Sequence, residues 1–169
     1  MTSDEACLDA FHQELDYLHR TLRRLGTPPL EVEDLAQEVF VALHRAWSGY
    51  DPGRPFRPYL FGIIFRVAAA HHRKRKRDAT VELVEVGDPG PGPYDALQSK
   101  QARGLVLAAL ERVPLLRRAV LIMHDIDEVP VDEMTVALGL PRFTIYSRLR
   151  KGRRELQAAV RRLTGGKLG

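Results

Sequence analysis

Apolar residues recur along the chain at spacings of three and four, the period of an amphipathic α-helix with one buried stripe. The pattern is clearest over residues 31–47, where prolines come before it, a glycine comes after it, and one face is polar. Similar rhythms over residues 4–25 and 56–76 predict one helix on either side of it. Turn-forming residues over 48–55 predict a loop between the second and third helices.

The second half of the chain shows the same helical period in shorter pieces. The predicted helices cover residues 97–112, 115–124, 131–138 and 141–163. Within the second of these, the apolar positions are Leu116, Ala119, Val120 and Met123. Gly139 separates the last two helices. A short helix, a turn with glycine and a longer helix form the helix-turn-helix arrangement.

The segment over residues 78–96 combines acidic side chains with alternating proline and glycine, which cannot continue a helix. We therefore predict an all-α fold in which a flexible acidic linker joins two small helical domains, residues 1–77 and 97–169. A second hypothesis for this linker is that it mimics nucleic acid and lies across a basic face.

The distribution of charge adds a further prediction, because acidic and basic residues lie in separate blocks of the sequence. The 169 residues carry a net charge of +4, but residues 54–77 and 142–154 contain only basic charges. Residues 78–95 and 125–133 contain only acidic ones. Two basic blocks separated by an acidic spacer predict two places where a polyanion could be bound.

Other features limit the class of protein. A single cysteine, Cys7, cannot form an internal disulfide, which is typical of a reducing compartment. The chain shows no signal peptide and no apolar run long enough to span a membrane, so we expect a cytoplasmic protein with no membrane insertion. Its histidines lack the spacing of metal ligands, and no nucleophile or phosphate loop is present. We therefore expect no metal, no cofactor and no enzymatic activity.

Three polar surfaces are candidates for binding. The polar face of residues 31–47 is either a solvated surface or a docking surface for a basic partner. The basic tail over residues 73–77 is either a solvated helix end or a phosphate-binding one. The helix that begins at Pro141 presents hydrogen-bond donors and flat side chains suited to the major groove of DNA, and the alternative is a solvated arginine-rich surface helix.

Three sequence blocks resemble one bacterial family. Residues 33–40, EDLAQEVF, are similar to the EDLxQExF signature of extracytoplasmic-function sigma factors. Residues 55–60, PFRPYL, follow at the spacing where that family has PFRAWL. Residues 144–156, TIYSRLRKGRREL, resemble the family's TVKSRLxRARxxL. The chain therefore resembles the group IV sigma factors, which are small two-domain proteins that start transcription.

This resemblance implies a role for particular residues. The residues matching the signature that docks on the polymerase β′ subunit are Asp34, Gln37, Glu38 and Phe40. Those matching the segment that captures the −10 strand are Ser48, Tyr50, Asp51, Arg54, Arg57, Tyr59, Arg66, Arg73, Lys74, Arg75, Lys76 and Arg77. Those matching the helix that reads the −35 duplex are Arg142, Phe143, Thr144, Tyr146, Ser147, Arg148, Arg150, Lys151 and Arg154.

The resemblance also implies partners. They are core RNA polymerase, through its β′ and β subunits, promoter DNA and an inhibitory anti-sigma factor, with nucleoid association when the protein is active. Two other functions compete with it on the residues alone. One is a stand-alone helix-turn-helix regulator that binds a palindrome as a dimer. The other is an adaptor that binds polymerase or another protein through residues 31–47 and never reads DNA. In the third predicted helix, Gly62, Arg66 and Ala70 stand where the family more often has polar or charged residues.

Overall fold

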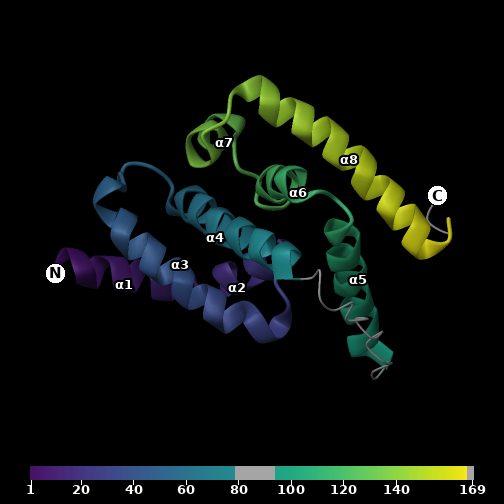
Figure 1. Cartoon of the computed structure of the whole chain (residues 1–169), viewed down its shortest axis with the longest axis horizontal. Coiled ribbons are helices and arrows are strands. Elements are labelled where there is room, and N and C mark those ends of the chain that lie inside the picture. The colour runs from purple at the N-terminus through teal and green to yellow at the C-terminus, as the bar shows by residue number, and fades with distance from the viewer. Residues whose placement is uncertain (79–93, 167–169) are drawn as a thin grey trace.

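The computed structural model describes residues 1–78 and 94–166, with the backbone alone described for residues 94–99. Every regular element in these residues is helical, which confirms the predicted all-α class with two helical domains (Figure 1). The α-helices are α1 (Ser3–Gln13), α2 (Leu15–Arg24), α3 (Val32–Ala46), α4 (Phe56–Asp78), α5 (Tyr94–Glu111), α6 (Leu115–Leu121), α7 (Val131–Leu138) and α8 (Arg142–Thr164). The shorter elements are the 3-10 turns η1 (Pro29–Glu31) and η2 (Trp47–Gly49) and the π-helical turn η3 (Ile122–Ile126).

The single helix predicted over residues 4–25 is wrong, because the chain is broken at Glu14 into α1 and α2. Glu14 leaves the helical conformation, with φ −108° and ψ 15°. The break lets α1 pack against α3 while α2 packs against α3, α4 and α5. No glycine or proline marks this position, so the apolar rhythm runs through it without a signal.

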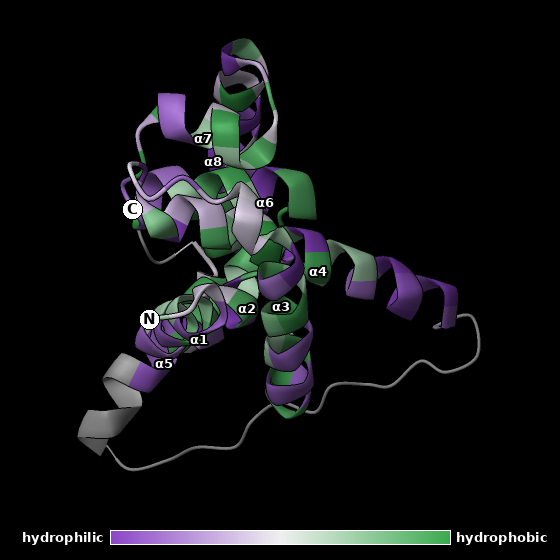
Figure 2. Cartoon of the chain, turned by 90° about the vertical axis from the view of Figure 1, so that its left-hand side faces the viewer, coloured by the Kyte–Doolittle hydropathy of each residue, from purple (hydrophilic) through white to green (hydrophobic). Residues whose placement is uncertain are grey.

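The core of the N-terminal domain lies where α3 and α4 pack side by side. Leu35 and Leu43 of α3 are almost wholly buried, as are Leu60 and Ile64 of α4. Each such side chain contributes about 1.5–3 kcal/mol through burial. Hydrophobic residues are concentrated where the helices meet, whereas the far end of α4 is hydrophilic (Figure 2). Cys7 of α1 is fully buried in this core, and burial raises the pKa of its thiol.

In the C-terminal domain, α8 packs against α5, α6 and α7. The turn between α7 and α8 forms as predicted. Gly139 ends α7 in the left-handed conformation at φ 65°, which favours glycine, and Pro141 stands immediately before α8. The predicted helix-turn-helix is therefore present, with its long second helix along one edge of the molecule (Figure 1).

The helix predicted over residues 115–124 is α-helical only to Leu121 and then widens into the π-helical turn η3. The N–H of Asp127 donates to the carbonyl of Ile122 at 2.9 Å, five residues back. Of the apolar positions in this helix, Ala119, Val120 and Met123 are buried, whereas Leu116 is half exposed. Arg118 is buried instead, for the reason given below.

The predicted linker falls mostly outside the described residues. Helix α4 continues to Asp78 and α5 begins at Tyr94, so helical backbone extends into both ends of residues 78–96. The remainder, residues 79–93, lies outside the part of the chain that the structure describes. The hypothesis that this segment mimics nucleic acid lies outside it as well.

Candidate nucleic-acid interface

The polar face of α3 is fully presented to solvent. Asp34, Gln37 and Glu38 are exposed, and neither carboxylate forms an ion pair with a described residue. Phe40 is half-buried and packs edge-on against Phe11, with 4.9 Å between ring centroids. Phe40 therefore supports the exposed face from the core side, while the three polar residues remain available to a partner.

A groove of about 940 Å³ runs between α3 and α4 and brings two predicted sites together. Asp34 and Glu38 lie on its α3 wall, and Tyr59 and Arg66 lie on its α4 wall. The residues predicted to dock on polymerase thus adjoin residues predicted to hold the −10 strand.

The loop after α3 is built around an aromatic cluster. Tyr50 stacks on Trp47 at 5.1 Å between ring centroids and contacts Phe56 and Tyr59 at 5.4 and 5.1 Å. The Tyr59 hydroxyl donates to the carbonyl of Ala46 at 2.7 Å, which ties α4 to the end of α3. The cluster fixes the conformation of the loop over residues 48–54, which resembles the base-capturing segment of the family. Sequence reasoning missed Trp47 and Phe56 as its other members, although four aromatic residues within 47–59 signal it.

Polar contacts hold the rest of this loop. The Asp51 carboxylate accepts from the Gly53 N–H at 2.9 Å, and the Arg54 N–H donates to the Asp51 carbonyl at 3.0 Å. Asp51 therefore shapes the turn. Ser48 and Arg54 are exposed beside it. Such a turn holds its donors in fixed positions, as recognition of a splayed base requires.

The predicted basic residues of α4 do not form one patch. Arg57 is paired with Glu14 at 2.8 Å and lies over the Tyr17 ring at 4.8 Å from its centroid. The tail over residues 73–77 is exposed, but α4 places it about 30 Å from the loop, at 1.5 Å per residue. Within the tail, Arg75 approaches Glu31 at 3.6 Å. Arg66 bonds its own helix, donating to the Gly62 carbonyl at 3.1 Å.

Helix α8 has one side buried against the domain and one side exposed to solvent. Ile145, Leu149 and Gly152 are buried against the domain. The exposed residues predicted to read DNA are Arg142, Phe143, Tyr146, Arg150, Lys151 and Arg154. The partly exposed ones are Thr144, Ser147 and Arg148. All nine lie away from the buried stripe, as a helix inserted in a major groove requires.

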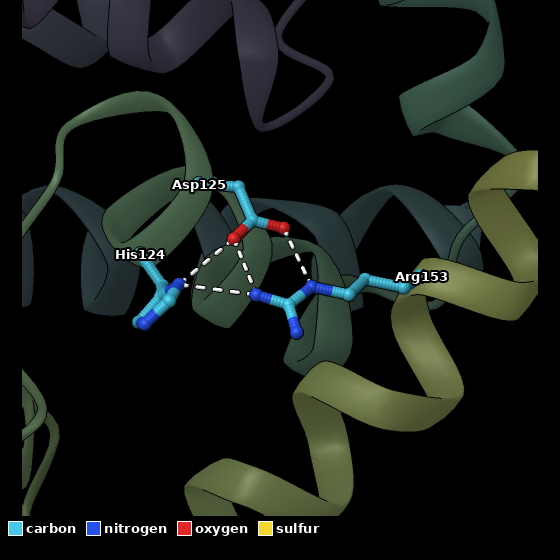
Figure 3. Close-up of polar contacts among 3 residues, drawn as sticks. All are labelled: His124, Asp125 and Arg153. Carbon is cyan, nitrogen blue, oxygen red and sulfur yellow. Dashed lines mark hydrogen bonds and ion pairs between the residues drawn. The ribbon is translucent and has the colours of Figure 1, made fainter.

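Arg153, also on α8, is paired with the turn η3. Its guanidinium donates to both Asp125 carboxylate oxygens, at 2.9 and 2.7 Å, and His124 lies beside the pair (Figure 3). The hydrogen bonds from Arg153 lower the pKa of Asp125 to about 2. The pair ties α8 to the turn η3. Arg153 is therefore a structural residue, although its spacing alone does not distinguish it from Arg154.

The Asp125 contact leads to a pH prediction. The Asp125 pKa is lowered from its ordinary 3.8 to about 2, so the contact stabilises the fold above pH 3.8 and this stabilisation is lost as the pH falls toward 2. The Asp125 side chain is 36% exposed, so Asp125→Asn is expected to cost about 1 kcal/mol near pH 6. Urea unfolding of wild type and variant should show this difference shrinking between about pH 5 and pH 2. Asp9→Asn, an exposed carboxylate on α1, is the control. A difference that stayed constant across the range would contradict the assignment.

No described helix is long and apolar enough to cross a membrane. Over the same residues, no group of three or more His, Cys, Asp or Glu side chains is placed to hold a metal ion.

Comparison with known proteins adds two family matches. Residues 10–78 match the profile of Sigma-70 region 2, and residues 103–156 match that of Sigma-70, region 4. The chain is 28% identical to the ECF RNA polymerase sigma factor SigE of Mycolicibacterium smegmatis, over 92% of this chain and 63% of that one. It is 26% identical to the RNA polymerase sigma factor CnrH of Cupriavidus metallidurans, over 85% and 80% of the two chains.

Two solved structures share this arrangement. CnrH in complex with the cytosolic domain of CnrY matches with a TM-score of 0.64 and 25% identity, over 91% of this chain and 86% of that one. The sigma factor RpoE of Bartonella quintana, in complex with the anti-sigma factor NepR, matches in fold with a TM-score of 0.61 at 22% identity. That match covers 90% of this chain and 97% of the other.

Proposed function

Because the chain belongs to the extracytoplasmic-function sigma factors, we propose that it binds core RNA polymerase and directs it to a dedicated class of promoters. Within that family we assign it to group IV. The synthesis of RNA belongs to the polymerase, and this chain is a non-catalytic factor. Its place of action is then the bacterial cytoplasm, on the nucleoid when it is active.

One observation carries this proposal. An exposed acidic face on α3 and an exposed basic face on α8 occur in a single chain, each within the matching region of the family. The acidic face offers charge complementarity to a basic protein surface, and the basic face offers it to DNA phosphates. A stand-alone helix-turn-helix regulator would have no use for the first face, and an adaptor would have no use for the second.

The site residues divide between three partners. Asp34, Gln37 and Glu38, supported by Phe40, would contact the β′ subunit. The loop over residues 48–54 and helix α4 would hold the −10 strand, and α8 would read the −35 duplex. The β subunit would contact the C-terminal domain. We take residues 1–77 and 97–169 as the two functional domains and residues 78–96 as their linker.

An anti-sigma factor is the proposed regulator. Two of the solved structures similar to this chain hold a sigma factor in complex with another protein, the cytosolic domain of CnrY in one and the anti-sigma factor NepR in the other. A partner of this kind would block the surfaces that polymerase and DNA use.

The assignment of α8 predicts a change in salt dependence. Lys151 is exposed on the outer side of α8, so Lys151→Ala should remove about one released counterion when a mixed-sequence duplex is bound. The slope of log affinity against log salt should then fall by about one, and Arg148→Ala should act similarly. The matched control is Arg153→Ala, since Arg153 is paired with Asp125 and should leave the slope unchanged. Equal slopes for Lys151→Ala and wild type, measured by fluorescence anisotropy, would remove Lys151 from the contact surface.

A further inference from the structure

Two aromatic side chains are exposed on the outer side of α8. Phe143 is 76% exposed and Tyr146 is 49% exposed. Every other aromatic side chain that the structure describes is buried or half-buried, in the core or in the cluster after α3. Aromatic rings stabilise a fold mainly through the surface that they bury. These two rings therefore contribute little to the core and are available to a partner.

Phe143 lies at the N-terminal end of α8, on the side farthest from the core. At 3.6 residues per turn it lies nearly opposite Ile145, whose side chain is fully buried. Ser147 and Arg150 follow it on the same stripe, at spacings of four and three. In a helix-turn-helix, the N-terminal residues of the second helix face the base edges. Phe143 is therefore placed where this helix would meet the bases.

The chemistry of the ring limits what it can recognise. A phenyl ring carries no hydrogen-bond donor or acceptor, so Phe143 can read a base only through apolar contact. In the major groove the apolar group is the 5-methyl group of thymine, whereas the other bases present hydrogen-bonding groups. The neighbouring Arg142 forms an ion pair with Asp132 of α7, which engages its guanidinium on the first helix of the motif. The ring is thus the apolar group that this end of α8 offers to a base.

We propose that Phe143 is a specificity-determining residue that contacts the 5-methyl group of a thymine in the −35 duplex. The inference rests on the proposed function, because it takes α8 as the helix that reads this duplex. Contact removes apolar surface of both the ring and the methyl group from water, which favours binding. Cytosine lacks the methyl group, so the ring distinguishes these two pyrimidines. Tyr146, one turn farther along, borders the same contact.

The test uses the full chain with core RNA polymerase and a promoter that this complex selects from a randomised library. Each thymine of the upstream element is replaced singly by deoxyuridine, which removes only the 5-methyl group. The wild type is compared with Phe143→Ala, which loses the exposed ring but no core residue. Val106→Ala on α5 is the matched control, since Val106 is an exposed apolar residue outside α8. Affinity is measured by competition with a labelled promoter duplex.

We expect one deoxyuridine substitution to weaken binding by the wild-type complex about fourfold, which corresponds to about 0.8 kcal/mol for one buried methyl group. The same substitution should have no effect with Phe143→Ala, whose affinity for the thymine duplex should already be lower by at least that factor. Val106→Ala should match the wild type on both duplexes. All three chains should melt at the same temperature, because both replaced side chains are exposed.

Equal losses for the wild type and Phe143→Ala at every thymine would overturn the proposal, as would a selected upstream element that contains no thymine. An affinity of Phe143→Ala that is lowered equally on all duplexes, with no effect of deoxyuridine on the wild type, would assign the ring to the DNA backbone instead and would also overturn it. A complex that selects no promoter from the library would contradict the proposed function itself, and the inference would fail with it.

Discussion

Replacing Asp34 and Glu38 together by lysine is expected to weaken binding to core RNA polymerase by about 30- to 1,000-fold. Both carboxylates are exposed on α3, and neither is engaged by a described residue. Reversal would place two cations against a basic partner surface, where a like-charge contact costs several kcal/mol and each 1.4 kcal/mol is tenfold. The fold itself loses no contact. The measurement is a titration of labelled polymerase with each chain.

The control for this variant is Asp9→Lys with Asp16→Lys, which changes the net charge equally at exposed positions on α1 and α2. This control should bind polymerase as the wild type does, apart from the general effect of charge. Equal affinities of the α3 variant and the control would remove the docking assignment. Binding of both variants to duplex DNA through α8 should stay at or above the wild-type level.

Replacing Arg118 by methionine is expected to lower the free energy of unfolding by about 3 kcal/mol. Arg118 is only 4% exposed, and its guanidinium donates to the carbonyls of Leu25, Val113 and Glu111 at 2.6, 2.9 and 3.0 Å. Methionine fills much of the volume but leaves these acceptors without a donor. The melting temperature should fall by about 6–12 °C, at 2–4 °C for each kcal/mol.

Arg112→Met serves as the control, since Arg112 is an exposed arginine six residues earlier in the chain. It should melt within about 2 °C of the wild type, as surface substitutions usually do. Similar melting temperatures for the two variants, measured by circular dichroism, would show that the buried guanidinium does not hold the domains together.

Much of this fold is predictable from local sequence patterns, because helix boundaries, turns and buried faces depend largely on residues close in sequence. The stripe of α3 and the glycine turn before α8 depend on residues close in sequence, and the structure has them where the pattern predicts. The same is true of the exposed side of α8, because burying Ile145 and Leu149 dictates which residues point outward.

The remaining features depend on tertiary contacts that no local pattern reports. The break at Glu14 follows from the different packing partners of α1 and α2, and its side chain is held by Arg57 from a distant helix. Arg153 is withdrawn from the DNA-facing set by Asp125, a residue 28 positions away. Arg118 interrupts an apolar run, so the sequence alone predicts a surface residue. It is buried because its guanidinium donates to the carbonyl of Leu25, which is distant in sequence. Gly62 is the exception, because a glycine inside a helix signals close packing. A Cβ at this position of α4 would lie 2.5 Å from the carbonyl oxygen of Ala137 in α7.

Run-off transcription from a promoter library tests the central claim most directly. Purified bacterial core polymerase would transcribe templates with randomised sequence upstream of a fixed cassette, with and without this chain. We predict new transcripts that appear only with the chain and whose templates share two sequence elements, near −10 and −35, and we predict that the Asp34 and Glu38 lysine variant abolishes them. Polymerase that gains no new start sites in the presence of the wild-type chain would contradict the account.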